Sequence, residues 1–360
     1  MQLQQRTVPL NTISSSQLKK IECGNSHCLL LFQDGSLYGF GGNEEGQLGI
    51  KMKGEKTQFI NKPAQINFIN SKLEYSIEDI AAGDNFSLIL ARINKQCQIF
   101  QFGLVFQDKY KSSLQEIKVI KNEELPRNDL NIKSIYAFGK RKMFLTYNND
   151  VYLGGIDFKL NKIDHYYLLA HFDNEIVSLS LGSNHCIIMD QKGNLYGIGD
   201  NTYGELGPMK LSEEKFSPLK FAKISSPIKK ICCGARHTVF LLNNGEVFAM
   251  GDNSLGQCYG FDSRIGMPIK VELNYEKGKV VDVFCGYSHN LLVRENGDIM
   301  TWGDSSSGKL GYNEEHLSQY NTKLVLDLQQ KCVTKVGLGA QMTVIATGDV
   351  EISVIKNNIK

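Results

Sequence analysis

Several features that mark particular protein classes are missing from this sequence of 360 residues. It has one tryptophan, seven prolines and a net charge of only +2. No apolar run approaches the roughly 18 residues of a membrane-spanning helix. No block of Lys and Arg has the length of a nucleic-acid-binding arm or a localisation signal. The composition therefore predicts a globular protein without a membrane span and without direct nucleic-acid binding.

The nine cysteines do not form a pattern that binds metal or forms disulfides. Their number is odd, no CxxC pair occurs, and the adjacent Cys232 and Cys233 suit neither a disulfide nor a tetrahedral zinc site. With no secretory signal peptide in view, we expect reduced thiols in an intracellular, cytoplasmic setting, with the cilium, the cytoskeleton or the nucleus as alternatives. The first 21 residues lack acids and faintly resemble a transit peptide.

Motifs of catalysis are also missing. No G-x-S-x-G segment occurs, and no Ser/His/Asp or Cys/His set is indicated. Residues 301–312, "TWGDSSSGKLGY", contain G-x-x-x-x-G-K, but a phosphate-binding loop needs Ser or Thr after the Lys, and Leu310 stands there. We therefore expect no enzymatic activity and no cofactor or metal.

What the sequence does contain is an internal repeat, which residues 21–49, 179–207, 230–260 and 283–311 show most clearly. The stretch 301–312 is the end of the last of these, so Lys309 aligns with Gln47. Weaker copies occupy residues 80–103, 135–155 and 336–356. Each copy has one anchor glycine, and consecutive anchors lie 43 to 59 residues apart: Gly24, Gly83, Gly139, Gly182, Gly234, Gly286 and Gly339.

Each copy is predicted to be β-structure. Asp34-Gly35, Asn244-Gly245 and Asn296-Gly297 indicate two-residue type I′ hairpin turns, and Lys192-Gly193 takes the same place with weaker turn chemistry. An unbroken apolar run such as "HCLLLF" precedes each turn, which predicts strands covered on both faces.

A further strand follows in six copies, and Pro near its start indicates an outer edge strand. These candidate strands are residues 63–68, 114–121, 165–172, 217–224, 267–273 and 322–328. The seventh copy ends before such a strand, and residues 5–13, "QRTVPLNTI", have the right character to supply it. The fold predicted for residues 1–360 is all-β: a single domain forming a seven-bladed β-propeller of four-stranded blades, with the N-terminal strand closing the last blade.

The unit resembles the regulator of chromosome condensation repeat, and residues 24–49 follow it almost position by position. WD40 and kelch repeats fit less well, because the Trp-Asp signature is missing and a diglycine occurs only at 41–42 and 154–155. The resemblance implies a propeller whose relatives include a Ran exchange factor, trafficking and ciliary adaptors, ubiquitin-ligase arms and a light sensor. Light sensing in those relatives uses clustered tryptophans, which Trp302 alone does not provide.

Four histidines share one repeat position: His27, His185, His237 and His289. Phe86, Lys142 and Met342 replace them in the weak copies, which a metal or catalytic cluster would not tolerate. We expect each histidine to begin a buried strand and bond the neighbouring turn. Asn43, Asn201 and Asn253, with Ser305 at the equivalent place, are predicted to stabilise turns.

The candidate partner-binding face rests on two groups of residues. Asp200, Asp252 and Asp304 share a repeat position and would gather on one face, where they receive a basic partner or are merely solvated. The weak second and third copies carry loops with aromatic side chains of the kind that anchors interfaces, unless these loops only reflect drift. These aromatic residues are Phe106, Tyr110, Phe158, Tyr166 and Tyr167.

Two functions follow as hypotheses. The first is a non-enzymatic interaction scaffold or adaptor that binds one or more proteins, with a ciliary, cytoskeletal or trafficking assembly as the setting suggested by family analogy. The alternative is a guanine-nucleotide exchange factor for a Ran-like small GTPase, although no wedge sequence of the exchange factors is recognisable in residues 106–121.

Overall fold

The computed structural model describes residues 4–9, 13, 16–50, 59–68, 74–104, 118–119, 130–159, 162–208, 214–222, 224, 226–273, 278–311, 323–324, 332–348 and 351–356. The chain divides into two compact units. The three-sheet unit comprises residues 9–173, and the four-sheet unit comprises residues 1–8 and 174–360.

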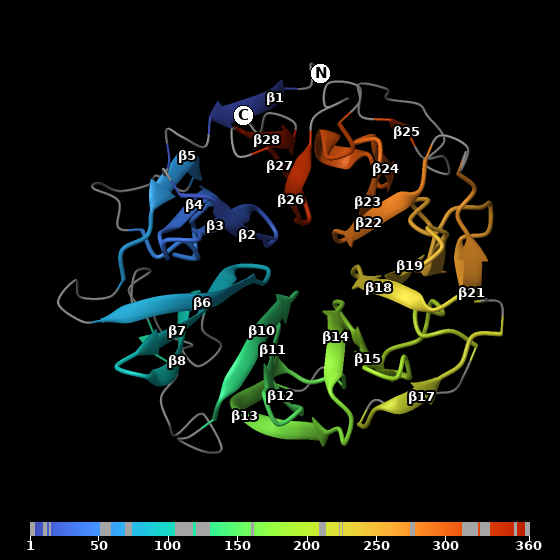
Figure 1. The fold of residues 1–360 in the computed structure, drawn as a ribbon, viewed down its shortest axis with the longest axis horizontal. Coiled ribbons are helices and arrows are strands. Elements are labelled where there is room, and N and C mark those ends of the chain that lie inside the picture. Colours follow the sequence, from blue (N-terminus) through green and yellow to red (C-terminus); the bar gives the residue numbers. More distant parts are fainter. Residues whose placement is uncertain are drawn as a thin grey trace. The chain divides into compact units, whose positions relative to one another are not determined.

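The three-sheet unit contains the first three repeat copies, each folded as one antiparallel four-stranded sheet in which sequence neighbours pair (Figure 1). The first sheet has the strands β2 (Leu18–Cys23), β3 (His27–Phe32), β4 (Leu37–Gly42) and β5 (Phe59–Gln65). The second has β6 (Tyr75–Ala82), β7 (Phe86–Ile93), β8 (Gln96–Gly103) and β9 (Lys118–Val119). The third has β10 (Ile132–Phe138), β11 (Arg141–Thr146), β12 (Asp150–Ile156) and β13 (Lys162–His171).

The four-sheet unit contains the last four copies. Its first two sheets have the strands β14 (Ile176–Leu181), β15 (His185–Asp190), β16 (Leu195–Gly199) and β17 (Ser217–Leu219), then β18 (Ile228–Cys233), β19 (His237–Leu242), β20 (Val247–Asp252) and β21 (Arg264–Lys270). Its last two have β22 (Val280–Cys285), β23 (His289–Arg294), β24 (Ile299–Gly303) and β25 (Lys323–Leu324), then β26 (Val333–Leu338), β27 (Thr343–Thr347) and β28 (Glu351–Lys356).

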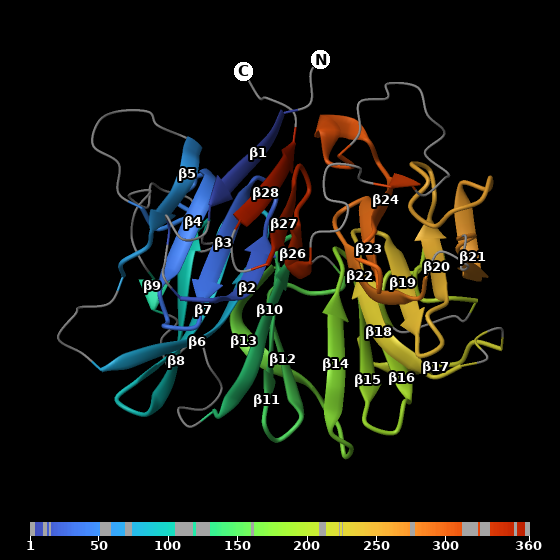
Figure 2. The same cartoon turned by 45° about the horizontal axis from the view of Figure 1, so that its top comes forward.

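The fourth strand of the last sheet comes from the other end of the chain. β1 (Gln4–Pro9) pairs with β28, so the strand order is β1-β28-β27-β26, and Figure 2 shows β1 running alongside β28. Seven four-stranded sheets confirm the all-β, seven-bladed propeller fold, and the N-terminal strand completes the last blade as predicted. That residues 1–360 form a single domain stays a prediction.

The second strand of each repeat carries the core. Every residue of β3, β11, β15, β19 and β23 is buried, which confirms that these strands are covered on both faces. The predicted outer strands overlap β5, β9, β13, β17, β21 and β25, each of which is the last strand of its sheet. Pro218 and Pro268 lie in such edge strands, where a missing N–H costs no ladder bond.

The predicted type I′ turns are wrong. Gly35, Gly193, Gly245 and Gly297 have φ between 80° and 88°, but the residues before them do not have positive φ. Gly35 N donates to Phe32 O (3.1 Å) and Phe32 N to Ser36 O (2.9 Å), so the loop is one residue longer and the glycine alone adopts the left-handed conformation. Among the residues placed by the structure, Asn94 and Lys95 are the adjacent pair with positive φ in a hairpin turn (48° and 70°).

Paired lysines join neighbouring sheets. Lys20 Nζ donates to Asp79 Oδ1 at 2.6 Å, and in the four-sheet unit Lys230 Nζ donates to Asp282 Oδ1 at 2.7 Å. The preceding lysine in each pair donates to a backbone carbonyl of the next first strand, Lys229 to Val281 O at 2.7 Å. First strands are sheet edges, so the lysines occupy acceptors that an edge would otherwise leave open.

Removal of residues 1–8 deletes most of β1 and leaves β28 as an open edge. We expect the thermal midpoint to fall by roughly 5 °C or more, at about 2–4 °C per kcal/mol, and aggregation to increase. Differential scanning calorimetry measures the midpoint, and a synthetic peptide of residues 1–13 added in trans should restore part of it. An unchanged midpoint would show that β1 does not hold the last sheet.

Candidate functional site

At the anchor glycine, consecutive sheets approach too closely to leave room for a side chain. A Cβ on Gly234 would lie 2.0 Å from His237 Cε1 and 2.7 Å from the carbonyl oxygen of Gly286, the next anchor. Gly24 has the same two neighbours in the three-sheet unit, His27 and the carbonyl of Gly83. The repeat therefore needs glycine because the histidine ring and the next sheet fill the space that any side chain would take.

Each repeat histidine bonds the following sheet. His237 Nε2 lies 2.8 Å from Asn290 Oδ1, and Asn290 Nδ2 donates to Gln257 O at 2.8 Å. The other three histidines repeat this arrangement with a hydroxyl: His27 with Ser87 (3.0 Å), His185 with Thr238 (3.0 Å) and His289 with Thr343 (2.9 Å).

The hydroxyl partners determine which nitrogen of the histidine ring carries the proton. Thr238 Oγ1 donates its proton to Glu205 O at 2.8 Å, so its oxygen accepts from His185 Nε2–H. All four rings are fully buried. Burial lowers the pKa of His27 and His237 to about 4 and that of His289 to about 3, so these rings are neutral at pH 7.

These contacts give the histidines a structural role, as predicted, although each bonds the next sheet and reaches the turn carbonyl only through that sheet's hydroxyl or amide. Among the described residues, no group of three or more His, Cys, Asp or Glu is arranged to hold a metal ion. None of the nine cysteines forms a disulfide. Within the part of the chain that the structure describes, no helix is long and apolar enough to cross a membrane.

The predicted acidic residues stabilise the turns that follow the third strands. Asp200, Asp252 and Asp304 each accept the backbone N–H two residues on, at 2.8, 2.9 and 2.9 Å. All three lie at the same repeat position in the four-sheet unit. Asp252 is buried, whereas the other two are half-buried, so the acids are unequally available. Their contact with a partner stays a prediction.

The asparagines close the same turns. Asn201 Oδ1 accepts from Leu206 N at 2.9 Å and its Nδ2 donates to Gly207 O at 2.8 Å. Asn43 does the same with Leu48 N and Ile50 O in the three-sheet unit. The predicted turn role of the asparagines is therefore confirmed.

The prediction of exposed aromatic anchors is wrong for two residues. Phe158 is 4% exposed and lies under the Arg141 guanidinium, 5.0 Å from it. Tyr166 is 5% exposed and packs on Phe144, because it points inward from β13 while Tyr167, the next residue of that strand, is half-buried. Burial raises the pKa of Tyr167. Phe106 and Tyr110 lie outside the described residues.

Other aromatic side chains are the exposed ones. Phe261, which follows a left-handed Tyr259 in a lengthened turn of the fifth copy, is 93% exposed. Tyr75 and Tyr147 in the three-sheet unit are 41% and 57% exposed. The signal for Phe261 was the extra residue in "GQCYG", which precedes it, where the first copy has "GQLG". No comparable feature of the sequence indicated that Tyr75 and Tyr147 would be exposed.

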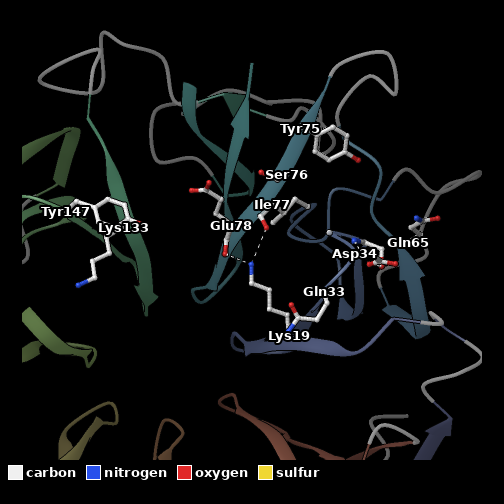
Figure 3. Close-up of a pocket in the computed structure, with 12 residues that line it drawn as sticks. Lys19, Gln33, Asp34, Gln65, Tyr75, Ser76, Ile77, Glu78, Lys133 and Tyr147 are labelled. Carbon is white, nitrogen blue, oxygen red and sulfur yellow. Dashed lines mark hydrogen bonds between the residues drawn. The ribbon is translucent and has the colours of Figure 1, made fainter. Parts of the chain in front are cut away.

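Tyr75 and Tyr147 line a polar groove of about 570 Å³ in the three-sheet unit (Figure 3). Its wall is the start of β6, which is two residues longer than the first strand of the first copy. Lys19 reaches across from β2, and its Nζ donates to Glu78 O at 3.0 Å. Lys133 and Tyr147 border the groove from the third sheet, and the 33–36 turn from the first.

The groove therefore has contributions from the first copy and from the second and third copies, which are two of the three weak ones. Glu78 at its wall is paired with Arg92 at 2.6 Å, so its carboxylate is already neutralised. The remaining lining combines the charged side chains of Lys19, Asp34 and Lys133 with hydroxyl, amide and backbone groups and two exposed phenol rings. Such a surface suits a protein segment that offers both hydrogen bonds and apolar contacts.

Comparison with known proteins gives consistent matches. A regulator of chromosome condensation (RCC1) repeat model matches residues 18–47, 176–205, 228–257 and 280–309, and a second model of this repeat matches 34–90, 192–241 and 244–293. Together the matches cover more than half of the chain. The ultraviolet-B receptor UVR8 of Arabidopsis thaliana is 25% identical over 85% of the chain, and the human probable E3 ubiquitin-protein ligase HERC3 is 30% identical over 47%. The chain spans 58% and 16% of these two relatives.

Solved structures match the fold over almost the whole chain. Human WBSCR16 has a TM-score of 0.74 at 17% identity, covering 96% of this chain and 88% of that one. Yeast RCC1 (Prp20), solved bound to Kap60, has a TM-score of 0.73 at 18% identity, covering 95% and 81%.

The neutral buried histidines predict a stability that falls with acid. The unfolded chain binds protons near pH 6.5 while the folded rings do not, so unfolding is favoured progressively as the pH drops from about 6.5 towards 4. Each ring contributes up to about 1.4 kcal/mol per pH unit.

Urea unfolding of the wild type and His237→Gln between pH 7.5 and 4.5 measures this effect. The variant keeps an amide that can donate to Asn290 but has no titrating ring, so its stability should fall less steeply by one histidine's contribution. Equal slopes for the two proteins would show that His237 is not held neutral by its burial.

Proposed function

Because the chain belongs to the regulator of chromosome condensation (RCC1) repeat family, we propose that it is a non-enzymatic protein-interaction scaffold. The RCC1-like propeller supports a protein-interaction or regulatory role. The finer assignment is supported by how the repeat uses its side chains. The histidines are enclosed between sheets, and the turn acids and amides bond backbone groups. The polar side chains at these described repeat positions therefore have structural roles.

The observation that carries the proposal is the polar groove of the three-sheet unit. Its two exposed tyrosines lie beside Lys133 and the 33–36 turn. Tyrosine supplies a large contact area with one hydrogen-bonding end at low entropic cost, which is why it recurs in protein interfaces. The setting of such a scaffold in a ciliary, cytoskeletal or trafficking assembly is part of the proposal by family analogy.

The alternative is guanine-nucleotide exchange on a Ran-like small GTPase. Family membership supports it in general terms, since one solved relative is Prp20p of Saccharomyces cerevisiae, whose study concerned binding to Gsp1p and histones. Residues 106–121, in which no wedge sequence is recognisable, lie outside the described residues except for Lys118 and Val119 of β9. The groove itself contains no feature specific to a nucleotide-binding protein.

The test is affinity capture from native lysate with the wild type, with Tyr75→Ser/Tyr147→Ser, and with Phe261→Ser as the control that removes an exposed ring in the other unit. We expect a stoichiometric partner that is kept by the wild type and the control and reduced at least tenfold by the double variant. Circular dichroism checks that all three proteins are folded.

Two results would contradict the scaffold. One is the absence of any stoichiometric partner, and the other is a partner that binds the double variant as well as the wild type. Release of fluorescent GDP from Ran is measured with the same proteins. Faster GDP release in the presence of the wild type would favour the exchange-factor function over the scaffold. We expect an unchanged rate.

A further inference from the structure

One position in the turns after the third strands carries different chemistry in different copies. It is occupied by Gln47, Glu205, Gln257 and Lys309 in the first, fourth, fifth and sixth copies. Both glutamines use Oε1 to accept a backbone N–H two residues earlier, at 3.0 and 2.8 Å. Glu205 Oε2 makes the same bond to Tyr203 N at 2.8 Å. One oxygen therefore suffices for the turn.

Lys309 places an ammonium group in the sixth copy. Its side chain is 4% exposed, and Nζ donates to Asp304 Oδ2 (2.5 Å), Ser306 Oγ (3.1 Å) and the backbone carbonyl of Ala340 (3.1 Å). Burial raises the pKa of Asp304, but the hydrogen bond and charge of Lys309, together with the hydrogen bonds from Ser306, outweigh burial and the pKa is lowered. The chain thus shows the acceptors that hold a primary ammonium at this turn.

The fourth copy has the same acceptors but no ammonium. Asp200 stands where Asp304 does, Thr202 where Ser306 does, and Ala235, which follows the anchor Gly234, where Ala340 follows Gly339. Asp200 Oδ1 accepts from Thr202 N and Oγ1 at 2.8 and 2.5 Å. Asp200 is half-buried and Thr202 exposed, so this turn is open to solvent.

Glu205 adds a buried carboxylate beneath these groups. It is 0% exposed, and among the residues that the structure places, its Oε1 has no hydrogen-bond partner. Desolvation, with a contribution from the negative charge of Asp200, raises the pKa of Glu205 to about 7. The nearby cation is Arg236, which stacks on the Tyr203 ring at 4.9 Å and donates to its hydroxyl at 3.1 Å. A buried carboxylate oxygen without a partner is costly unless a cation or proton satisfies it.

We propose that the fourth-copy turn binds the ammonium group of a lysine side chain from a protein partner, held by Asp200, Thr202 and the Ala235 carbonyl, with Glu205 as the buried counter-charge. The inference rests on the proposed interaction function and names the chemistry of a partner. A primary ammonium fits because Lys309 shows three single acceptors converging on one nitrogen. Arginine, a planar fork that favours paired acceptors, matches this arrangement less well.

Proton release accompanies binding in this scheme. The ammonium favours ionised Glu205, so a bound lysine displaces the proton that Glu205 carries below about pH 7. Affinity should therefore rise about tenfold from pH 6 to pH 8. His27, His237 and His289 are neutral between pH 6 and pH 8, and the lysine stays charged. Titration of these histidines or of the lysine therefore does not cause the pH dependence of the affinity.

The probe is the peptide acetyl-(Gly-Lys-Gly-Ser)4-amide, with the Nζ-acetylated peptide as the uncharged comparison. Isothermal titration calorimetry at pH 6, 7 and 8 measures its affinity for the wild type, Glu205→Gln, Glu205→Lys and Glu44→Gln. Glu205→Gln restores the residue of the first and fifth copies, and Glu205→Lys that of the sixth, so both suit the fold. Glu44→Gln removes one acid from the equivalent turn of the first copy.

We expect the wild type and Glu44→Gln to bind the lysine peptide with the tenfold pH dependence. Glu205→Gln should bind at least tenfold more weakly at pH 8 with a flat profile, and Glu205→Lys should not bind, because its own ammonium fills the turn. Equal, pH-independent binding by the wild type and Glu205→Gln, or equal binding of the acetylated peptide, would overturn the proposal. So would displacement of the peptide by Ca²⁺ or Mg²⁺ alone at millimolar concentration.

These outcomes are independent of the lysate experiment. Peptide binding at Glu205 with no stoichiometric partner in lysate would leave the lysine site in place and remove the scaffold. A partner that needs Tyr75 and Tyr147, together with no peptide binding, would do the reverse.

Discussion

The contact on which both units depend is the one between an anchor glycine, the histidine three residues later and the next sheet. In the four-sheet unit the ring of His237 lies against Gly234 and reaches Asn290, whose amide returns to the preceding turn. This arrangement joins three segments of two copies through two hydrogen bonds and leaves no room for a side chain at the anchor. In the four copies that carry the histidine, the sheet is thereby fixed to the next one by groups that the repeat itself supplies, as expected for nearest-neighbour architectures.

Function then has to come from positions that the contact does not use. In the second copy the first hairpin is longer, and its strand forms the wall of the groove beside Tyr75. At one turn position the fourth copy has a carboxylate and the sixth copy an ammonium group in place of the amide. Both variations occur within otherwise regular sheets, because a turn or a hairpin end can change without disturbing the contact between sheets. A repeat fold of this kind can present two chemically different surfaces on one scaffold.

The sequence predicts the seven sheets and the role of β1 because glycine spacing and unbroken apolar runs report directly on backbone geometry and burial. It misjudges features set by the next copy. The partners of the histidines, such as Thr238 and Asn290, share only the capacity to accept and donate, and they lie 53 residues away. Tyr166 lies in the strand predicted over residues 165–172 and is buried because it points inward from that strand, β13, onto Phe144. Glu205 is unusual only when compared with Lys309 in space.

Substitution of Gly234 by alanine tests the central contact most directly, with Gly266→Ala as its control. A Cβ at 234 would meet the His237 ring, whereas a Cβ at 266 meets nothing within 4 Å. We expect Gly234→Ala to lower the free energy of unfolding in urea by roughly 3 kcal/mol or more, through overpacking and loss of the histidine bond. Gly266→Ala should stay within about 0.5 kcal/mol of the wild type. A Gly234→Ala protein as stable as its control would contradict the account.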